Sequence, residues 1–105
     1  MKNIIYNNQI IGTCFKVRYI YDLLEDTSNF MIEDVDKPTY IIAEKLTIEE
    51  NILPLFIGLI RTNQPFKIII DKIEWNIKVT NIEDYSFGQG AKLLTIKAKV
   101  YEDLL

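Results

Sequence analysis

The chain has 105 residues, a length that fits one domain with one hydrophobic core. Apolar residues make up 49% and charged residues 26%, which is ordinary for a globular protein and excludes a disordered chain. No apolar run is long enough to span a bilayer as a helix, and the N-terminal residues contain no signal-peptide core. The lone Cys14 excludes an internal disulfide. These features predict a single domain over residues 1–105, located in the cytoplasm, with no membrane association.

Three residue types dominate the composition. The chain contains 19 Ile, 10 Lys and 8 Asn, and all three have AT-rich codons. This bias indicates a bacterial genome of low GC content, or a phage or mobile element that lives in one.

Charge is spread unevenly along the chain. The net charge is −3, with +3 over residues 1–21, −7 over residues 22–50 and +1 over the remainder. Glu33, Asp34 and Asp36 form the densest acidic group. We interpret the acidic stretch over residues 22–50, which includes this group, either as solvated loops and strand edges or as an acidic face for a basic partner, because its negative charge attracts a positive surface over long range. The spacing within the group of Glu33, Asp34 and Asp36 matches no calcium-binding loop.

The N-terminal half is predicted to form strands. Segment 15–21 alternates between large apolar and polar side chains, and Asn7-Asn8 offers a turn because Asn tolerates positive φ. Short segments flanked by Asp, Ser, Asn and Pro are expected at an edge. The predicted strands in this half cover residues 2–6, 9–11, 15–21, 30–32 and 39–43.

One helix is predicted between the two halves. Thr47 to Glu50 has the pattern of a capping box, but Pro54 then falls in the second turn, where it removes a hydrogen bond. With Asn51 as the cap, Pro54 lies in the first turn at no cost. We therefore expect a kink at residues 53–54, or a short turn followed by a helix over 52–62.

That helix is apolar around most of its circumference, which is typical of a helix buried on several sides. One small sheet covers only one face, so the other face is expected to pack against loops or against another chain. Leu53 and Ile57 are the candidate partner contacts on this helix.

The C-terminal part predicts three antiparallel strands over residues 66–70, 73–80 and 94–100. Alternation is cleanest in the second strand, where Trp75 is expected to be largely buried on the apolar side. Asp71-Lys72 predicts a tight hairpin turn of uncertain type. The loop over residues 83–90 is either a plain hairpin connection or a protruding loop that offers the rings of Tyr85 and Phe87 to a partner.

The sequence lacks the residues that catalytic sites usually contain. The chain has no His, its two serines therefore have no imidazole to activate them, and Cys14 is expected to be a buried, inert thiol. Clusters of His and Cys that bind metals are absent as well. No catalytic residue, metal or cofactor is predicted.

Nucleic-acid binding has one supporting feature. Lys97 and Lys99 share a predicted strand face, with Lys78 on the neighbouring strand, and together they form a modest basic strip. A pI near 4.9 opposes phosphate binding.

The sequence as a whole predicts an α+β fold, with antiparallel sheets, one central helix and a C-terminal three-stranded meander. It predicts a non-catalytic protein that binds a protein partner or itself, as an inhibitor, an adaptor or an assembly subunit. A nucleic-acid or nucleotide-ligand binding module is the alternative.

Overall fold

The computed structural model describes residues 1–21, 38–84 and 92–101. Six antiparallel strands close into a barrel in the order β1-β2-β3-β6-β5-β4. The strands are β1 (Lys2–Tyr6), β2 (Gln9–Ile20), β3 (Tyr40–Ile48), β4 (Phe66–Ile70), β5 (Ile73–Asp84) and β6 (Lys92–Tyr101), and one helix, α1 (Leu53–Arg61), joins β3 to β4.

Two tight hairpins connect neighbouring strands as the sequence predicts. Asn7 and Asn8 between β1 and β2 have φ values of 55° and 65°, and Asp71 and Lys72 between β4 and β5 have 53° and 67°. Two successive residues of positive φ form the turn whose twist matches that of the flanking strands. The turn at Asp71-Lys72 is therefore of the favoured kind even though it lacks Gly.

The barrel is closed by two seams that join strands distant in sequence. Seven residue pairs join β3 to β6, from Tyr40↔Lys99 to Ile48↔Lys92. In the described residues, a single ladder pair, Ile5↔Ile69, joins β1 to β4. The edges that an open sheet would leave free are thereby paired, and no described strand is left at an edge.

The predicted α+β fold is wrong, because the chain forms a closed barrel made mostly of strands. The three C-terminal strands pair in sequence order, but β6 continues to β3 and β4 to β1, so they are part of a barrel and not a separate meander. Alternation along the chain reports which face of a strand is buried, and that pattern is the same in an open sheet and in a barrel of this size.

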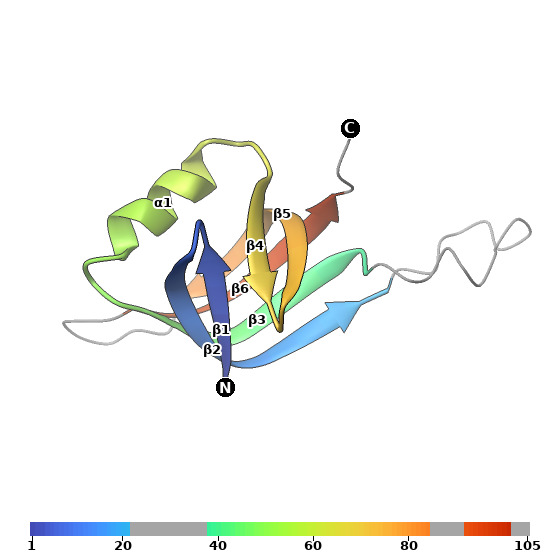
Figure 1. Cartoon of the computed structure of the whole chain (residues 1–105), viewed down its shortest axis with the longest axis horizontal. Helices are drawn as coiled ribbons and strands as arrows, with labels where there is room; N and C mark the ends of the chain where they lie inside the picture. Colours follow the sequence, from blue (N-terminus) through green and yellow to red (C-terminus); the bar gives the residue numbers. More distant parts are fainter. Residues whose placement is uncertain (22–37, 85–91, 102–105) are drawn as a thin grey trace, which may run out of the picture.

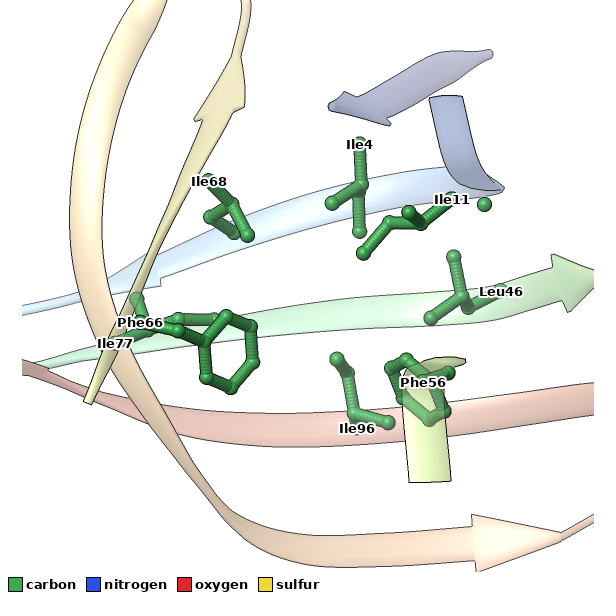
Figure 2. A pocket seen from close by; sticks show the side chains of 9 residues that line it. Ile4, Ile11, Leu46, Phe56, Phe66, Ile68, Ile77 and Ile96 are labelled. Carbon is green, nitrogen blue, oxygen red and sulfur yellow. The ribbon is translucent and has the colours of Figure 1, made fainter. Parts of the chain in front are cut away.

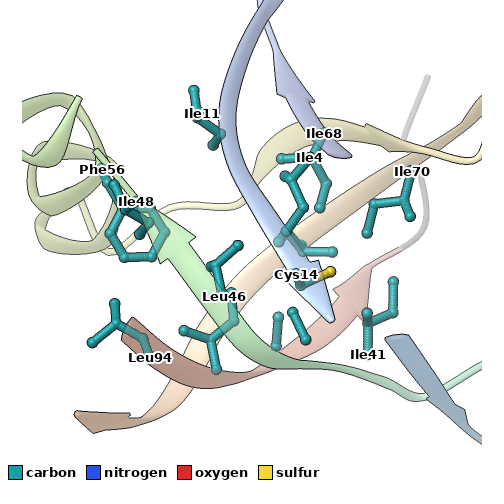
Figure 3. Packing of buried hydrophobic residues seen from close by; sticks show 14 residues of the cluster. Ile4, Ile11, Cys14, Ile41, Leu46, Ile48, Phe56, Ile68, Ile70 and Leu94 are labelled. Atoms are coloured by element: carbon teal, nitrogen blue, oxygen red, sulfur yellow. The ribbon is translucent and has the colours of Figure 1, made fainter. Parts of the chain in front are cut away.

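Alternate side chains of all six strands fill the barrel (Figure 3). Fourteen apolar residues are buried, and no polar residue of the described chain is. Gly12 allows β2 to pack closely on Leu46, since a Cβ there would lie 2.7 Å from Leu46 Cδ1. The buried set consists of Ile4, Ile11, Cys14, Ile41, Ala43, Leu46, Ile48, Phe56, Ile68, Ile70, Ile77, Leu94, Ile96 and Ala98.

Helix α1 lies across one end of the barrel (Figure 1). Its one buried residue, Phe56, reaches the interior, while Leu55 and Ile57 are each 38% exposed. The described part of the chain therefore leaves the outer face of α1 uncovered, and its expected packing against another chain stays a prediction. This short helix is the only one in the described residues, and it does not have the length or apolar character to cross a membrane.

The start of α1 also differs from the capping-box prediction. Thr47 lies within β3, and the helix begins after Ile52 with Pro54 in its first turn and no side-chain cap. The pairing of β3 with both β2 and β6 through Thr47 outweighs the local capping pattern. The alternative that places Pro54 in the first turn is confirmed, but without Asn51 as a cap.

Trp75 is only partly buried, and its ring lies against Tyr19 with a centroid distance of 5.4 Å. The prediction that it is largely buried is therefore only partly correct. Its indole N–H is buried and has no hydrogen-bond partner among the described residues.

Candidate binding groove

The barrel interior has no room for a ligand among the described residues that line it. The space there is about 10 Å³, near the minimum for one water molecule, and its lining is apolar. Figure 2 shows the side chains of Ile4, Leu46, Phe56 and Ile96 pointing into it. A binding site has to be sought on the outer surface.

An open groove of about 840 Å³ lies on the outside of the barrel, across four adjacent strands, β2, β3, β6 and β5. Its apolar lining comes from Ile42 and Leu93, and the rest is polar or charged. The complete lining is Arg18, Ile42, Glu44, Lys45, Asn81, Glu83, Leu93, Thr95 and Lys97.

Two β-bulges flank β6 at this groove. The register of β3 against β6 shifts between Ala43 and Leu46, and that of β5 against β6 shifts between Val79 and Asn81. A bulge bends its strand and increases the local twist. We attribute the hollow in the outer surface to these two bends.

Hydroxyl groups hold both bulges to β6. The backbone N–H of Lys45, whose φ is 51°, donates to Thr95 Oγ1 at 3.2 Å. On the other side, the hydroxyl of Thr80 lies 3.2 Å from the backbone oxygen of Lys97 and 3.0 Å from Asn81 Oδ1, and it donates its single proton to one of them at a time. The groove is thus built from the barrel strands themselves.

Where these four strands pair with one another, their outward side forms a surface that we call the basic face. Glu74 of β5 lies beyond it, opposite Ile69 of β4 and 3.6 Å from Lys67. Its charged residues are Lys16, Arg18, Lys45, Lys78, Lys97 and Lys99, with Glu44 and Glu83. Six bases and two acids give the basic face a net charge of +4, in a chain whose net charge is −3. The other described residues carry five bases and five acids, so the positive excess of the described barrel lies on this one face.

Three lysines of the basic face lie over aromatic rings. The Nζ of Lys97 is 4.3 Å from the ring centroid of Tyr40, and that of Lys99 is 5.4 Å from the ring of Tyr101. Lys45 lies 5.5 Å over Phe15, a ring that is 62% exposed. Attraction between each ammonium group and its ring stabilises these positions.

One close pair on the basic face is unfavourable. Lys78 on β5 is directly opposite Lys99 on β6. Like charges in directly opposite positions destabilise a pair of strands. By contrast, the Nε of Arg18 lies 2.8 Å from Glu44 Oε1, so that pair is locally neutral.

The structure separates the residues that the sequence suggested for partner contacts. Leu53 packs against the core, whereas Ile57 is exposed on α1. Three acidic and two aromatic candidates lie outside the described residues: Glu33, Asp34, Asp36, Tyr85 and Phe87.

The groove was not predicted, although Lys78, Lys97 and Lys99 of the predicted basic strip belong to the basic face. Arg18 and Lys45 join them only through the β2–β3 and β3–β6 pairings.

The burial predicted for Cys14 is confirmed, with an exposed fraction of 0%. Burial raises the pKa of its thiol above the ordinary value, which keeps it protonated near neutral pH. No group of three or more His, Cys, Asp or Glu side chains in the described ranges could hold a metal ion.

The fold and this surface define a small closed β-barrel with an external, positively charged groove. Comparisons with protein families, with curated proteins and with solved structures found no match to the chain.

Proposed function

We propose that this protein is a non-catalytic binding protein, an inhibitor, adaptor or assembly subunit, whose protein partner docks in the outer groove. The observation that carries the proposal is the separation of charge in the described barrel. A net charge of +4 lies on the basic face and the remaining described surface is balanced. Such a surface favours one orientation of a partner over all others.

The make-up of the groove supports a protein partner. Ile42 and Leu93 supply an apolar centre, and Phe15 adds an exposed ring beside it. Charged and polar side chains, among them Arg18 and Thr95, surround that centre. Protein interfaces combine an apolar centre with a polar rim, and aromatic residues and Arg are enriched in them.

The chemistry of the chain supports binding over catalysis. It contains no His, and its one thiol is buried with a raised pKa, whereas a nucleophilic thiol needs a lowered pKa and access to substrate. Removal of Cys14 as Cys14→Ala is therefore expected to leave binding unchanged.

The proposal is tested by isolating a partner from an extract of the cells in which the protein occurs. The partner is then identified and purified, and its affinity for the protein is measured by calorimetry. The double variant Arg18→Glu/Lys97→Glu reverses two charges of the groove and is expected to lower the affinity about a hundredfold. Lys72→Glu changes charge at the β4–β5 turn, away from the basic face, and serves as the control.

Ile57→Asp tests the alternative that the exposed side of α1 is the contact surface. Circular dichroism establishes that each variant folds. Wild-type affinity in the double variant, or loss of affinity in Ile57→Asp alone, contradicts the proposal.

A further inference from the structure

We propose that the groove recognises an acidic segment of its partner, in which carboxylates flank an apolar side chain. This inference rests on the proposed function and specifies the chemistry of the partner. Three features carry it: an unfavourable lysine pair on the basic face outside the groove lining, an apolar residue between two cations in the groove, and the two carboxylates of the groove lining.

The lysine pair indicates an anionic partner. Lys78 and Lys99 are directly opposite each other, and Lys97 lies two residues before Lys99 on the same strand face. In the free protein this arrangement costs stability through repulsion. An anion bound between these side chains reduces the repulsion between Lys78 and Lys99, so that repulsion favours the complex over the free protein.

The floor of the groove indicates where an apolar side chain binds. In the strand register, Ile42 is opposite Arg18 on one side and Lys97 on the other. Neighbouring strands are about 4.8 Å apart, which places the two cationic residues about 10 Å apart across Ile42. A bound segment that puts an apolar side chain on Ile42 brings one flanking carboxylate to Lys97 and the other to Arg18, whose guanidinium it would share with Glu44.

The carboxylates of the groove favour an acidic peptide over nucleic acid. Glu44 and Glu83 line the groove beside its three cations, and their charge lowers its attraction for a continuous phosphate backbone. Lys97 and Lys99 each occupy one face of Tyr40 and Tyr101, which leaves Phe15 as an exposed ring on which a base could stack. A peptide carries carboxylates only at its Asp and Glu residues, so its sequence can keep them away from Glu44 and Glu83.

The test uses a fluorescent peptide of about eight residues that alternates Glu and Val, long enough at about 3.3 Å per residue to cross four strands. Its affinity for the full chain is measured by anisotropy at about 50 mM and about 300 mM salt. Matched probes are the same peptide with Gln in place of Glu, and an oligothymidylate of similar length.

The acidic peptide is expected to bind at least tenfold more tightly than the Gln peptide and the oligothymidylate, and to weaken as salt rises. Lys97→Glu is expected to lower its affinity about tenfold, and Lys72→Glu to leave it unchanged. Lys78→Glu converts the repulsive pair with Lys99 into an attractive one, so it is expected to raise Tm while weakening peptide binding.

Tighter binding of the oligothymidylate overturns the inference in favour of a nucleic-acid groove. Absence of peptide binding, or equal loss in Lys97→Glu and Lys72→Glu, also overturns it. An identified partner that docks on the basic face through a segment without acidic residues refutes only this inference, whereas a partner unaffected by Arg18→Glu/Lys97→Glu refutes the proposed function itself.

Discussion

The two seams that close the barrel are held in different ways. β3 and β6 are joined by seven ladder pairs, and the core residues Ala43 and Ile96 face each other across that seam. β1 and β4 share one pair, and side chains complete the closure. There the rings of Tyr6 and Phe66 meet edge to face at 6.1 Å, and Lys2 Nζ lies 2.6 Å from Asp71 Oδ2. The comparison shows that a barrel can be closed by backbone pairing at one seam and chiefly by side chains at the other.

The largest effect is expected at the β3–β6 seam. Ile96 is 4% exposed and lies in the core, so Ile96→Ala should lower the free energy of unfolding by about 2 to 5 kcal/mol, measured by urea denaturation. Ile82, its opposite neighbour on β5, is 44% exposed and provides the control. Ile82→Ala should cost less than about 1 kcal/mol. Equal losses would show that the burial assigned to this seam is wrong.

A smaller effect is expected at the β1–β4 seam. A double-mutant cycle with Tyr6→Ala and Phe66→Ala should give a coupling energy of about 0.5 to 1.5 kcal/mol for the two rings. The same seam should open first, so the amides of β1 and β4 should exchange with solvent faster than those of β3 and β6. Uniform exchange across the barrel would contradict the difference between the seams.

The smallest expected effect concerns pH. The thiol of Cys14 lies 3.6 Å from the backbone oxygen of Lys2 and so links β2 to β1 beside the weaker seam. Burial raises its pKa, so the folded protein holds this proton more tightly than the unfolded chain. This contribution is complete below the ordinary value of 9.0 and is lost as pH rises above it.

Urea midpoints of the wild type should therefore fall between about pH 7.5 and pH 10, and should fall less in Cys14→Ala. Burial also raises the pKa of Tyr19, so part of the decline should remain in that variant. An identical decline in both proteins would exclude the thiol as a cause.

Local features of the fold could be predicted from the sequence because they depend on neighbouring residues. Alternation located the strands of the C-terminal part, and Asn7-Asn8 and Asp71-Lys72 located two hairpins. The closing seams could not be predicted, since Ile5 and Ile69 are far apart in the chain and nothing in either segment specifies the other. Thr47 was misassigned for a related reason, because its strand pairs are also distant in sequence.

The groove could be predicted only in part. The alternation of β6 placed Lys97 and Lys99 on one face, and Lys78 was expected nearby. Arg18 and Lys45 reach the same surface through pairings that span many residues, and the hollow itself follows from bulges that no short pattern marks. Side-chain periodicity therefore predicted some of the charges but not the surface that they share.

The charge of the described barrel also bears on how fast a partner would bind. The basic face carries the positive excess of the described residues, whereas residues 22–37 and 102–105 carry −7 in the sequence, so the chain as a whole is acidic. If the partner segment is acidic, as we propose, the basic face would attract it within about one Debye length and favour first contact at Lys97. Association would then be faster than the about 10⁵–10⁶ M⁻¹s⁻¹ of neutral docking. Added salt would slow this encounter more than it would speed dissociation of the proposed apolar contact at Ile42.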